Sequence, residues 1–456
     1  MKEQEMMQFC TAVRREAEKS GIADYEIYAV YGEDFSVTVE GGEIEQYSVN
    51  EFSAASLRLM QDGKTGYAST TALAEDGIPA LIAAAKENAA AIESKEQQFL
   101  FEGSAQYTYP KVSDERVNAA DAAEKIRFAR ALEQKALALD PRVVRTEGSY
   151  VMSGEKTRVI LNSRGLSLKE TSSSIGAYVV PIAEIDGNMN SGFAVAAGFS
   201  LDDIDMDALA KESVKSAIDF CGAKSTAGKP MRVIFENRAA ADLLATFSSV
   251  FFAENAQKGL SLLSGKENTK IASAAISLSD DALIDGGYGS RAFDDEGVAG
   301  QKTVVVENGV LKTLLYNLKT AARAGVASTG NATKAGYSSP IATAVTNFCI
   351  KPGSAAKEEL IASLSDGILI TEVSGLHSGA NPVTGDFSLT AQGYLLKDGK
   401  IGRPVSCITV SGNFYHLLRD VEAVGSDLYI SPFGAAVGSP SLLVAKEMSV
   451  SGSEEA

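Results

Sequence analysis

The sequence predicts an α+β protein with a helix-bearing N-terminal half and a β-rich C-terminal domain. Two observations favour this class. Helical patterns rich in Ala, Leu and Lys alternate with strand patterns up to about residue 222. Beyond that point, Asn-Gly and Asp-Gly pairs separate apolar runs, as they do in β-hairpins. We therefore expect three regions: an N-terminal α+β domain (1–110), a middle α+β region (111–222) and a C-terminal β-rich domain (223–456).

The N-terminal region should start with an amphipathic helix, since four side chains recur near helical spacing: Met7, Cys10, Val13 and Ala17. Segments that alternate apolar and polar residues predict two hairpins, which turn at Gly41-Gly42 and Asp62-Gly63. The Ala-rich stretch 77–93 predicts a helix. The polar and aromatic stretch 97–113 is expected to be a linker or an extended arm.

The middle region should contain a helix from about Asp121 to Leu139, because Asp140-Pro141 stops it. Strands are expected over 143–184. A second helix follows, with Asp202 or Asp203 near its N-cap. The turn over 225–230 marks the start of the last region.

The C-terminal region should contain hairpin turns at Asn308-Gly309 and Asp398-Gly399. A helix starting near Glu254 is expected to run into a glycine-capped turn at Gly265. The acidic run from Asp294 to Glu296 is interpreted as a solvated acidic turn, with a cation site as the alternative.

The composition narrows the function. The 42 basic and 59 acidic side chains give a net charge of −17, which disfavours binding to nucleic acid or to anionic membranes. The charged N-terminus is unlike a signal peptide, and no apolar run is long enough to span a bilayer. The four cysteines form no CxxC pair. We therefore expect a soluble, intracellular protein with reduced thiols.

The loop "GLHSGANPVTGDFSL" (375–389) gathers the most polar chemistry of the chain. His377 and His416 are its only histidines, and neither an HExxH nor a GxSxG motif is present. A mixed metal site built from both histidines and a carboxylate remains open. The loop itself could be a structural staple, a binding surface or a catalytic site, and the first is favoured by its turn-forming residues. In that case Asp386 should cap backbone N–H groups within 375–387.

The C-terminal half resembles the TldD/PmbA family, also described as modulators of DNA gyrase, and especially its PmbA (TldE) branch. The segments that carry the resemblance are "AQKGLSLLSGK", "DDEGVAGQKTVVVENGVLKTLLYN", "SGLHSGANPVTGDFSLTAQGYLLKDGKIGRPV", "SGNFYHLLRDVEAVGSDL" and "GSPSLLV". The N-terminal half fits more loosely, through "LNSRGL" and the early hairpins.

The resemblance implies a cytoplasmic zinc metalloprotease made of two related subunits, which digests unfolded peptides and trims peptide precursors. Its TldD subunit holds zinc through HExxxH and a later cysteine. Aligned by eye, Phe235, Glu236 and Ala240 occupy the HExxxH positions, and "LYISPFGAAVGSPSLLV" replaces the cysteine loop. Phenylalanine and alanine cannot ligate zinc, so we expect no metal site and no catalytic residues in this chain.

The leading hypothesis is therefore a PmbA/TldE-like subunit that works with a zinc-carrying TldD-like partner or as a homodimer. Its substrates would be unfolded peptides and peptide precursors, with neither nucleic acid nor membrane as a partner. The residues expected to line the substrate surface are His377, Asn381 and Asp386. The alternatives are an independent peptidase or hydrolase with an unrecognised site, and a non-catalytic regulator that binds gyrase or a toxin–antitoxin component.

Overall fold

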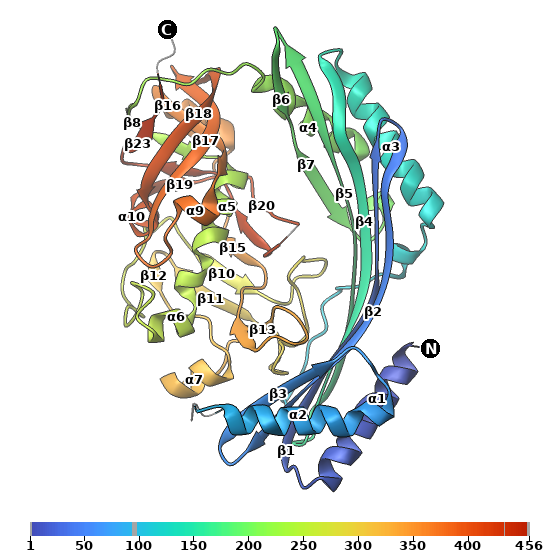
Figure 1. Cartoon of the computed structure of the whole chain (residues 1–456). Helices are drawn as coiled ribbons and strands as arrows, with labels where there is room; N and C mark the ends of the chain where they lie inside the picture. Colours follow the sequence, from blue (N-terminus) through green and yellow to red (C-terminus); the bar gives the residue numbers. More distant parts are fainter. Residues whose placement is uncertain (1, 94–97, 433, 454–456) are drawn as a thin grey trace.

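A long, curved antiparallel sheet dominates the computed structural model, which describes residues 2–93, 98–432 and 434–453 (Figure 1). The strands run in the order β3-β2-β1-β4-β5-β6, and β7 also pairs with β5. Their bounds are β1 Asp24–Glu40, β2 Glu43–Gln61, β3 Lys64–Thr70, β4 Val143–Asn162, β5 Ser167–Ile185, β6 Asn188–Ser191 and β7 Ala194–Gly198. The first two regions expected from the sequence thus contribute to one sheet.

The two faces of this sheet have different neighbours because side chains alternate along each strand. On β1, Ile27 and Ala29 pack with one helix pair, and Val37 and Val39 pack with the other. Tyr28, between them, points to the opposite face and packs with the C-terminal domain. The helices are α1 Lys2–Lys19 and α2 Ile78–Ala91 at one end, and α3 Ala122–Leu139 and α4 Met206–Asp219 at the other.

All four predicted hairpin turns are confirmed. They join β1 to β2, β2 to β3, β11 (Lys302–Glu307) to β12 (Val310–Leu311), and β17 (Asp386–Lys397) to β18 (Lys400–Asn413). Asn308 and Asp398 have φ angles of 47° and 51°, and a glycine with positive φ follows each of them. This backbone geometry is the reason for the Asn-Gly and Asp-Gly pairs.

The predicted helix over 121–139 is confirmed, and Asp121 forms a capping box with Glu124. The N-cap expected for the next helix was wrong. Asp205, not Asp202 or Asp203, accepts from the Ala208 N–H, and a short 3-10 turn takes up Leu201–Asp203. The chain offers several aspartates in succession, and each is a residue type that favours the N-cap.

Two larger sheets, the two-stranded sheet β13-β14 and short helices form the C-terminal domain. One sheet runs β12-β11-β10-β15-β21-β20 and the other β19-β22-β9-β16-β17-β18-β23-β8. The remaining strands are β8 Lys229–Met231, β9 Val233–Phe235, β10 Leu278–Asp281, β13 Ala332–Lys334, β14 Ile341–Thr343, β15 Phe348–Ile350, β16 Asp366–Ser374, β19 Val421–Val424, β20 Tyr429–Ile430, β21 Val437–Ser439, β22 Leu442–Val444 and β23 Met448–Ser451.

Helix α5 (Asn237–Phe247) lies in the core of this domain, where Phe247 stacks on Phe414. The other helices are α6 Ala253–Gln257, α7 Leu318–Ala324, α8 Lys357–Ala362, α9 Leu376–Gly379 and α10 Phe414–Asp420. The helix expected from Glu254 to Gly265 is wrong in length. Helix α6 stops at Gln257 because Gly259, with φ 73°, already turns the chain.

The predicted arm crosses between the sheet and the C-terminal domain, with no helix or strand over 98–114. The Tyr107 hydroxyl donates to the Gly297 carbonyl, and the Lys111 N–H donates to Asp285. Residues 94–97, at the start of this stretch, lie outside the described residues. The arm therefore ties the two halves of the molecule together.

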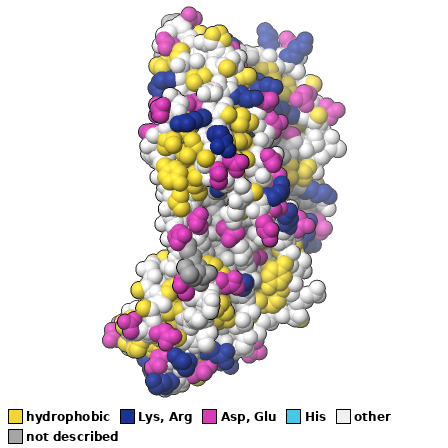
Figure 2. All heavy atoms as spheres, turned by 90° about the vertical axis from the view of Figure 1, so that its right-hand side faces the viewer, with side chains coloured by type: hydrophobic (Ala, Val, Ile, Leu, Met, Phe, Trp, Pro, Cys, Tyr) yellow, Lys and Arg dark blue, Asp and Glu magenta, His cyan; other side chains and the backbone are white. Residues whose placement is uncertain are grey.

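On the outer face of the sheet, acidic and basic side chains are interspersed (Figure 2). This face thus offers no continuous basic surface of the kind that binds nucleic acid. Within the described residues, no helix is both long and apolar enough to cross a bilayer.

Candidate functional site

A charged cavity of about 980 Å³ lies between the sheet and the C-terminal domain. Its walls come from β7 and α4 on one side and from β16, β17, the start of α5 and the start of α8 on the other. In Figure 1, β20 lies on the side of the C-terminal domain that faces the upper part of the sheet. Polar groups from distant segments therefore meet at this one place.

The junction between β9 and α5 positions Glu236 in this cavity. Strand β9 pairs in parallel with β16, and the Glu236 N–H continues that ladder by donating to the Ile370 carbonyl at 2.8 Å. Helix α5 starts at the next residue, so the Glu236 side chain is left at its N-terminus. The Lys357 ammonium donates to this carboxylate at 2.6 Å. Burial alone would lower the pKa of Lys357, but Glu236 raises it above its ordinary value, which favours the charged ammonium.

Phe235 and Ala240, which flank Glu236 in the predicted alignment, point away from solvent. Phe235 ends β9 with no exposed surface, and Ala240 is 2% exposed within α5. Neither side chain carries a donor atom for a metal. In the described part of the chain, no three His, Cys, Asp or Glu side chains are grouped so that they could hold a metal ion.

Two carboxyl groups of the cavity lie close enough to affect each other. Burial, and next the charge of Glu372, raise the pKa of Asp242 to about 6. The pKa of Glu372 is also raised by burial, although the Gln392 side chain donates to its carboxylate at 2.8 Å. Arg238 is near both and offsets part of the repulsion. The cavity therefore holds negative charge that the protein compensates incompletely.

Ion pairs across the cavity join α4 to the C-terminal domain. Arg238 of α5 pairs with Glu212 of α4, and its guanidinium lies over the Tyr429 ring at 4.9 Å. The Tyr394 hydroxyl of β17 donates to Asp219 of α4 at 2.5 Å, and burial, followed by this hydrogen bond, raises the pKa of the tyrosine. These contacts keep the cavity walls in a defined arrangement.

The predicted loop lies elsewhere. His377, Asn381 and Asp386 are exposed, and none of them lines the charged cavity. Asn381 and Asp386 are brought together, since the Asn381 N–H donates to the Asp386 carbonyl at 2.8 Å. His377 lies on the single turn α9.

The capping role expected of Asp386 belongs to Asn381. The side-chain oxygen of Asn381 accepts from the Val383 N–H at 3.0 Å and from the Thr384 N–H at 3.4 Å. The Asp386 carboxylate accepts instead from the Asn413 side chain at 2.8 Å, which is the main reason for its lowered pKa. These hydrogen bonds, within the loop and from Asn413, hold its backbone in one conformation, which agrees with the structural interpretation.

The acidic run Asp294–Glu296 is buried, so the prediction of a solvated turn was wrong. Its three side chains are 0%, 4% and 3% exposed. One oxygen of Asp294 accepts from the Glu296 and Val298 N–H groups, and the other accepts from the Ala332 N–H, each at 2.9 Å. Backbone donors therefore satisfy this carboxylate, in place of water or a cation.

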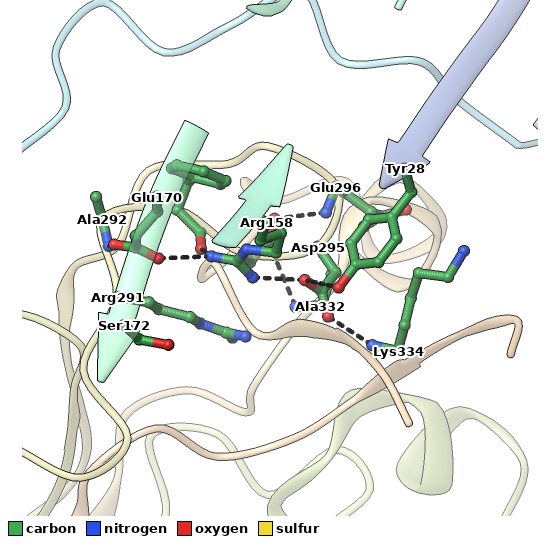
Figure 3. Close-up of polar contacts among 12 residues, drawn as sticks. Tyr28, Arg158, Glu170, Ser172, Arg291, Ala292, Asp295, Glu296, Ala332 and Lys334 are labelled. Atoms are coloured by element: carbon green, nitrogen blue, oxygen red, sulfur yellow. Dashed lines mark hydrogen bonds and ion pairs between the residues drawn. The ribbon is translucent and has the colours of Figure 1, made fainter. Parts of the chain in front are cut away.

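Arg158 of β4 is the centre of a buried cluster around Asp295 (Figure 3). Its guanidinium pairs with Asp295 and, at 2.8 Å, with Glu170, and it lies over the Phe293 ring at 4.5 Å. The Tyr28 hydroxyl donates to Asp295 at 3.2 Å. Burial alone would raise the pKa of Asp295, but Arg158 holds it below its ordinary value.

The same cluster extends to Glu296 and Lys334. The Leu318 N–H donates to Glu296 at 2.8 Å, while burial and neighbouring Asp294 raise the pKa of Glu296. Lys334 donates to the Ser56 hydroxyl at 3.0 Å, and burial lowers its pKa to about 8. The cluster connects β1, β2, β4 and β5 to the C-terminal domain.

Sequence reasoning missed this cluster, although a signal was present. Glu26, Arg58 and Arg158 stand next to apolar residues within strands, where a charged side chain that becomes buried needs a partner. Asp295 could not be named as that partner, because 137 positions separate it from Arg158.

Comparison with known proteins agrees with this architecture. Models of the PmbA/TldA metallopeptidase family match domain 1 at residues 25–89, the central domain at 115–219 and the C-terminal domain at 227–452. Metalloprotease PmbA of Escherichia coli O157:H7 is 24% identical over 436 residues, covering 92% of this chain and 90% of that protein. An uncharacterised protein of Methanocaldococcus jannaschii is 30% identical, covering 91% and 95%.

Solved structures share the fold. A protein described as a modulator of DNA gyrase, from Thermotoga maritima, superposes with a TM-score of 0.89 at 31% identity, covering 98% of this chain and all of that one. TldE from Thermococcus kodakarensis has the same fold, with a TM-score of 0.87 at 22% identity, covering 97% and 100%. The chain belongs to the PmbA/TldA metallopeptidase family.

Proposed function

We propose that this chain is the PmbA/TldE-like subunit of a cytoplasmic two-subunit zinc metalloprotease that acts on unfolded peptides. A TldD-like partner would carry the zinc and its nucleophilic water, and this chain would complete the chamber that holds the peptide. A homodimer is the second assembly that fits the proposal. The similarity to PmbA and TldE proteins supports membership in such a protease. The lack of metal-ligating atoms on the residues that flank Glu236 supports the assignment of zinc to the partner subunit.

The observation that carries the proposal is the Glu236–Lys357 ion pair. Zinc in a hydrolase needs about three protein ligands and an open position for water. Beside Glu236, Phe235 and Ala240 supply no ligand, and the Lys357 ammonium already neutralises the carboxylate. A lysine cation at this place repels a metal ion instead of binding it. The residues present therefore do not fit zinc, and we assign no hydrolytic step to this chain.

The test compares the purified lone chain with its complex. We expect the lone chain to contain no stoichiometric zinc by elemental analysis and to leave an unfolded peptide intact. Mixed with a TldD-like protein from the same organism, it should form a complex in size-exclusion chromatography and show chelator-sensitive cleavage.

The opposite result is equally specific. One tightly bound zinc per chain, with proteolysis that disappears in the His377→Ala/His416→Ala variant, would overturn the proposal and favour an independent peptidase. A stable complex with a gyrase or antitoxin subunit, and none with a TldD-like protein, would favour a regulator.

A further inference from the structure

The charged cavity does not end at α4 but adjoins a second cavity. This serine-lined cavity, of about 590 Å³, lies between the middle of the sheet and the loop at 286–290. Val195 of β7 lines the charged cavity and Ala197 lines the serine-lined one. On the opposite wall, Ser431 lines the charged cavity and Pro432 lines the serine-lined one. The two cavities thus form one groove that follows β7.

Strand β7 is an edge strand along this groove. It pairs with β5 through Ala194–Gly198, and no other strand in the described ranges pairs with its outer edge. An unpaired edge presents backbone donors and acceptors that can bind an added strand. The Tyr288 hydroxyl reaches the Ala197 carbonyl at 3.3 Å, a long hydrogen bond that a ligand N–H could replace. The seven residues 193–199 span roughly 20 Å, enough for about six or seven residues of an extended chain.

Side chains above this edge suit a flexible, partly apolar ligand. Phe193 is 47% exposed at the groove and lies against the Tyr178 ring, with centroids 5.4 Å apart. Tyr178 in turn stacks on Tyr150 at 4.2 Å. Such an aromatic row binds aliphatic stems and cations without demanding one particular side chain.

The charge of the groove selects among such ligands. The charged cavity is lined by six acidic and three basic side chains. Each basic side chain is paired with an acid: Lys357 with Glu236, Arg238 with Glu212 and Lys215 with Asp219. The excess carboxylates include Asp242 and Glu372, which lie close enough to repel one another. A cationic ligand would relieve that repulsion.

The cation that fits is organic. Three metal ligands do not gather anywhere in the described residues, so a metal ion would be held by too few donors. A lysine or arginine side chain needs only one or two carboxylates and an apolar surface for its stem. The groove offers both within the length of one extended segment.

We propose that this groove binds an extended, basic polypeptide segment as an added strand on β7, with a lysine or arginine side chain beside Asp242 and Glu372. The proposal rests on the peptide-handling function proposed above and names the class of peptide. It requires neither zinc nor the partner subunit, because every contact comes from this chain.

Binding to the lone chain tests it. The probes are fluorescein-labelled nine-residue peptides of Ser, Gly and Val with two central arginines, or with two central glutamates in their place. A third peptide keeps the arginines but carries N-methyl groups on alternate amides, which removes its strand-forming donors. By fluorescence anisotropy, we expect the arginine peptide to bind about tenfold more tightly than either of the others.

The matched protein variants are Asp242→Asn/Glu372→Gln, which keeps the shapes, and Asp76→Asn, an exposed change at the opposite end of the sheet. The first should weaken binding of the arginine peptide about tenfold, and the second should leave it unchanged. Equal affinity for arginine and glutamate peptides, or insensitivity to Asp242→Asn/Glu372→Gln, would overturn the proposal. So would unchanged binding of the N-methylated peptide. Peptide binding by the lone chain and complex formation with a TldD-like protein are measured in separate experiments. A negative result for one proposal therefore does not imply a negative result for the other.

Discussion

Replacing Asp242 by asparagine should stabilise the protein at neutral and alkaline pH. In the folded chain, burial and the charge of Glu372 raise the pKa of Asp242 from 3.8 to about 6. At pH 8 the carboxylate is ionised in both states, and the raised pKa corresponds to about 3 kcal/mol against folding. Because the side chain is partly exposed to the cavity, solvent screening reduces this to about 1–2 kcal/mol. Asparagine never carries the charge, so the variant should recover that free energy.

The pH dependence gives the sign of the effect. A raised pKa means that the folded state holds its proton more tightly than the unfolded chain does. Stability from this group is therefore fully present below about pH 4 and is lost as the pH rises through about 6. The advantage of Asp242→Asn should be largest at pH 8, fall to about half by pH 5 and to about a fifth at pH 4.

Urea denaturation of both proteins at pH 4, 5, 6 and 8 measures this difference, with Asp76→Asn as the exposed control. In a double-mutant cycle, Glu372→Gln should share part of the gain, so the double variant should gain less than the sum of the single changes. An Asp242→Asn protein that is no more stable than wild type at pH 8 would refute the repulsion argument. A gain independent of pH would refute its electrostatic origin.

Three other substitutions test the structure. Arg158→Leu should lower the free energy of unfolding by about 3–5 kcal/mol in urea denaturation, because it leaves Asp295 buried without its cation. The exposed Arg14→Leu is the control and should cost less than about 1 kcal/mol. A loss that small for Arg158→Leu would contradict the cluster. Asn381→Ala should cost about 1 kcal/mol through the lost loop cap and leave peptide binding intact, so that normal stability with lost binding would reassign the loop to function. Gly393→Ala should lower the melting temperature by several degrees, since its Cβ would lie 1.9 Å from the Leu369 carbonyl oxygen, and an unchanged melting curve would show that β16 and β17 are not so close.

Local chemistry in the sequence predicted local structure well. Turns at Gly41-Gly42 and Asn308-Gly309 follow from the positive φ angles that hairpins require, and the end of α3 follows from Pro141. These features depend on residues within a few positions of one another. By contrast, Asp202, Asp203 and Asp205 are all of a residue type that favours the N-cap, and local chemistry does not distinguish them.

Contacts between residues that lie far apart in the chain could not be predicted from the sequence. The acidic run at 294–296 has the composition of a surface turn, and its burial depends on partners from distant segments, such as Arg158 for Asp295 and the Leu318 N–H for Glu296. Likewise, Glu236 could be placed by resemblance, but its neutralisation by Lys357 joins residues 121 positions apart. The groove along β7 depends on how the N-terminal sheet packs against the C-terminal domain, and strand patterns in the sequence do not predict that packing.

The length of the strands in the curved sheet has a consequence for how the chain unfolds. Strand β1 contributes Ile27 to the core beneath α1 and α2 and Val37 to the core beneath α3 and α4. The same unbroken strand thus serves two separate hydrophobic clusters, so neither can melt without fraying the ladder that supports the other. We expect the first two family domains to unfold in one cooperative transition, and a fragment ending near residue 110 to remain without tertiary structure. The two domains occupy separate stretches of the sequence but should gain and lose their structure together.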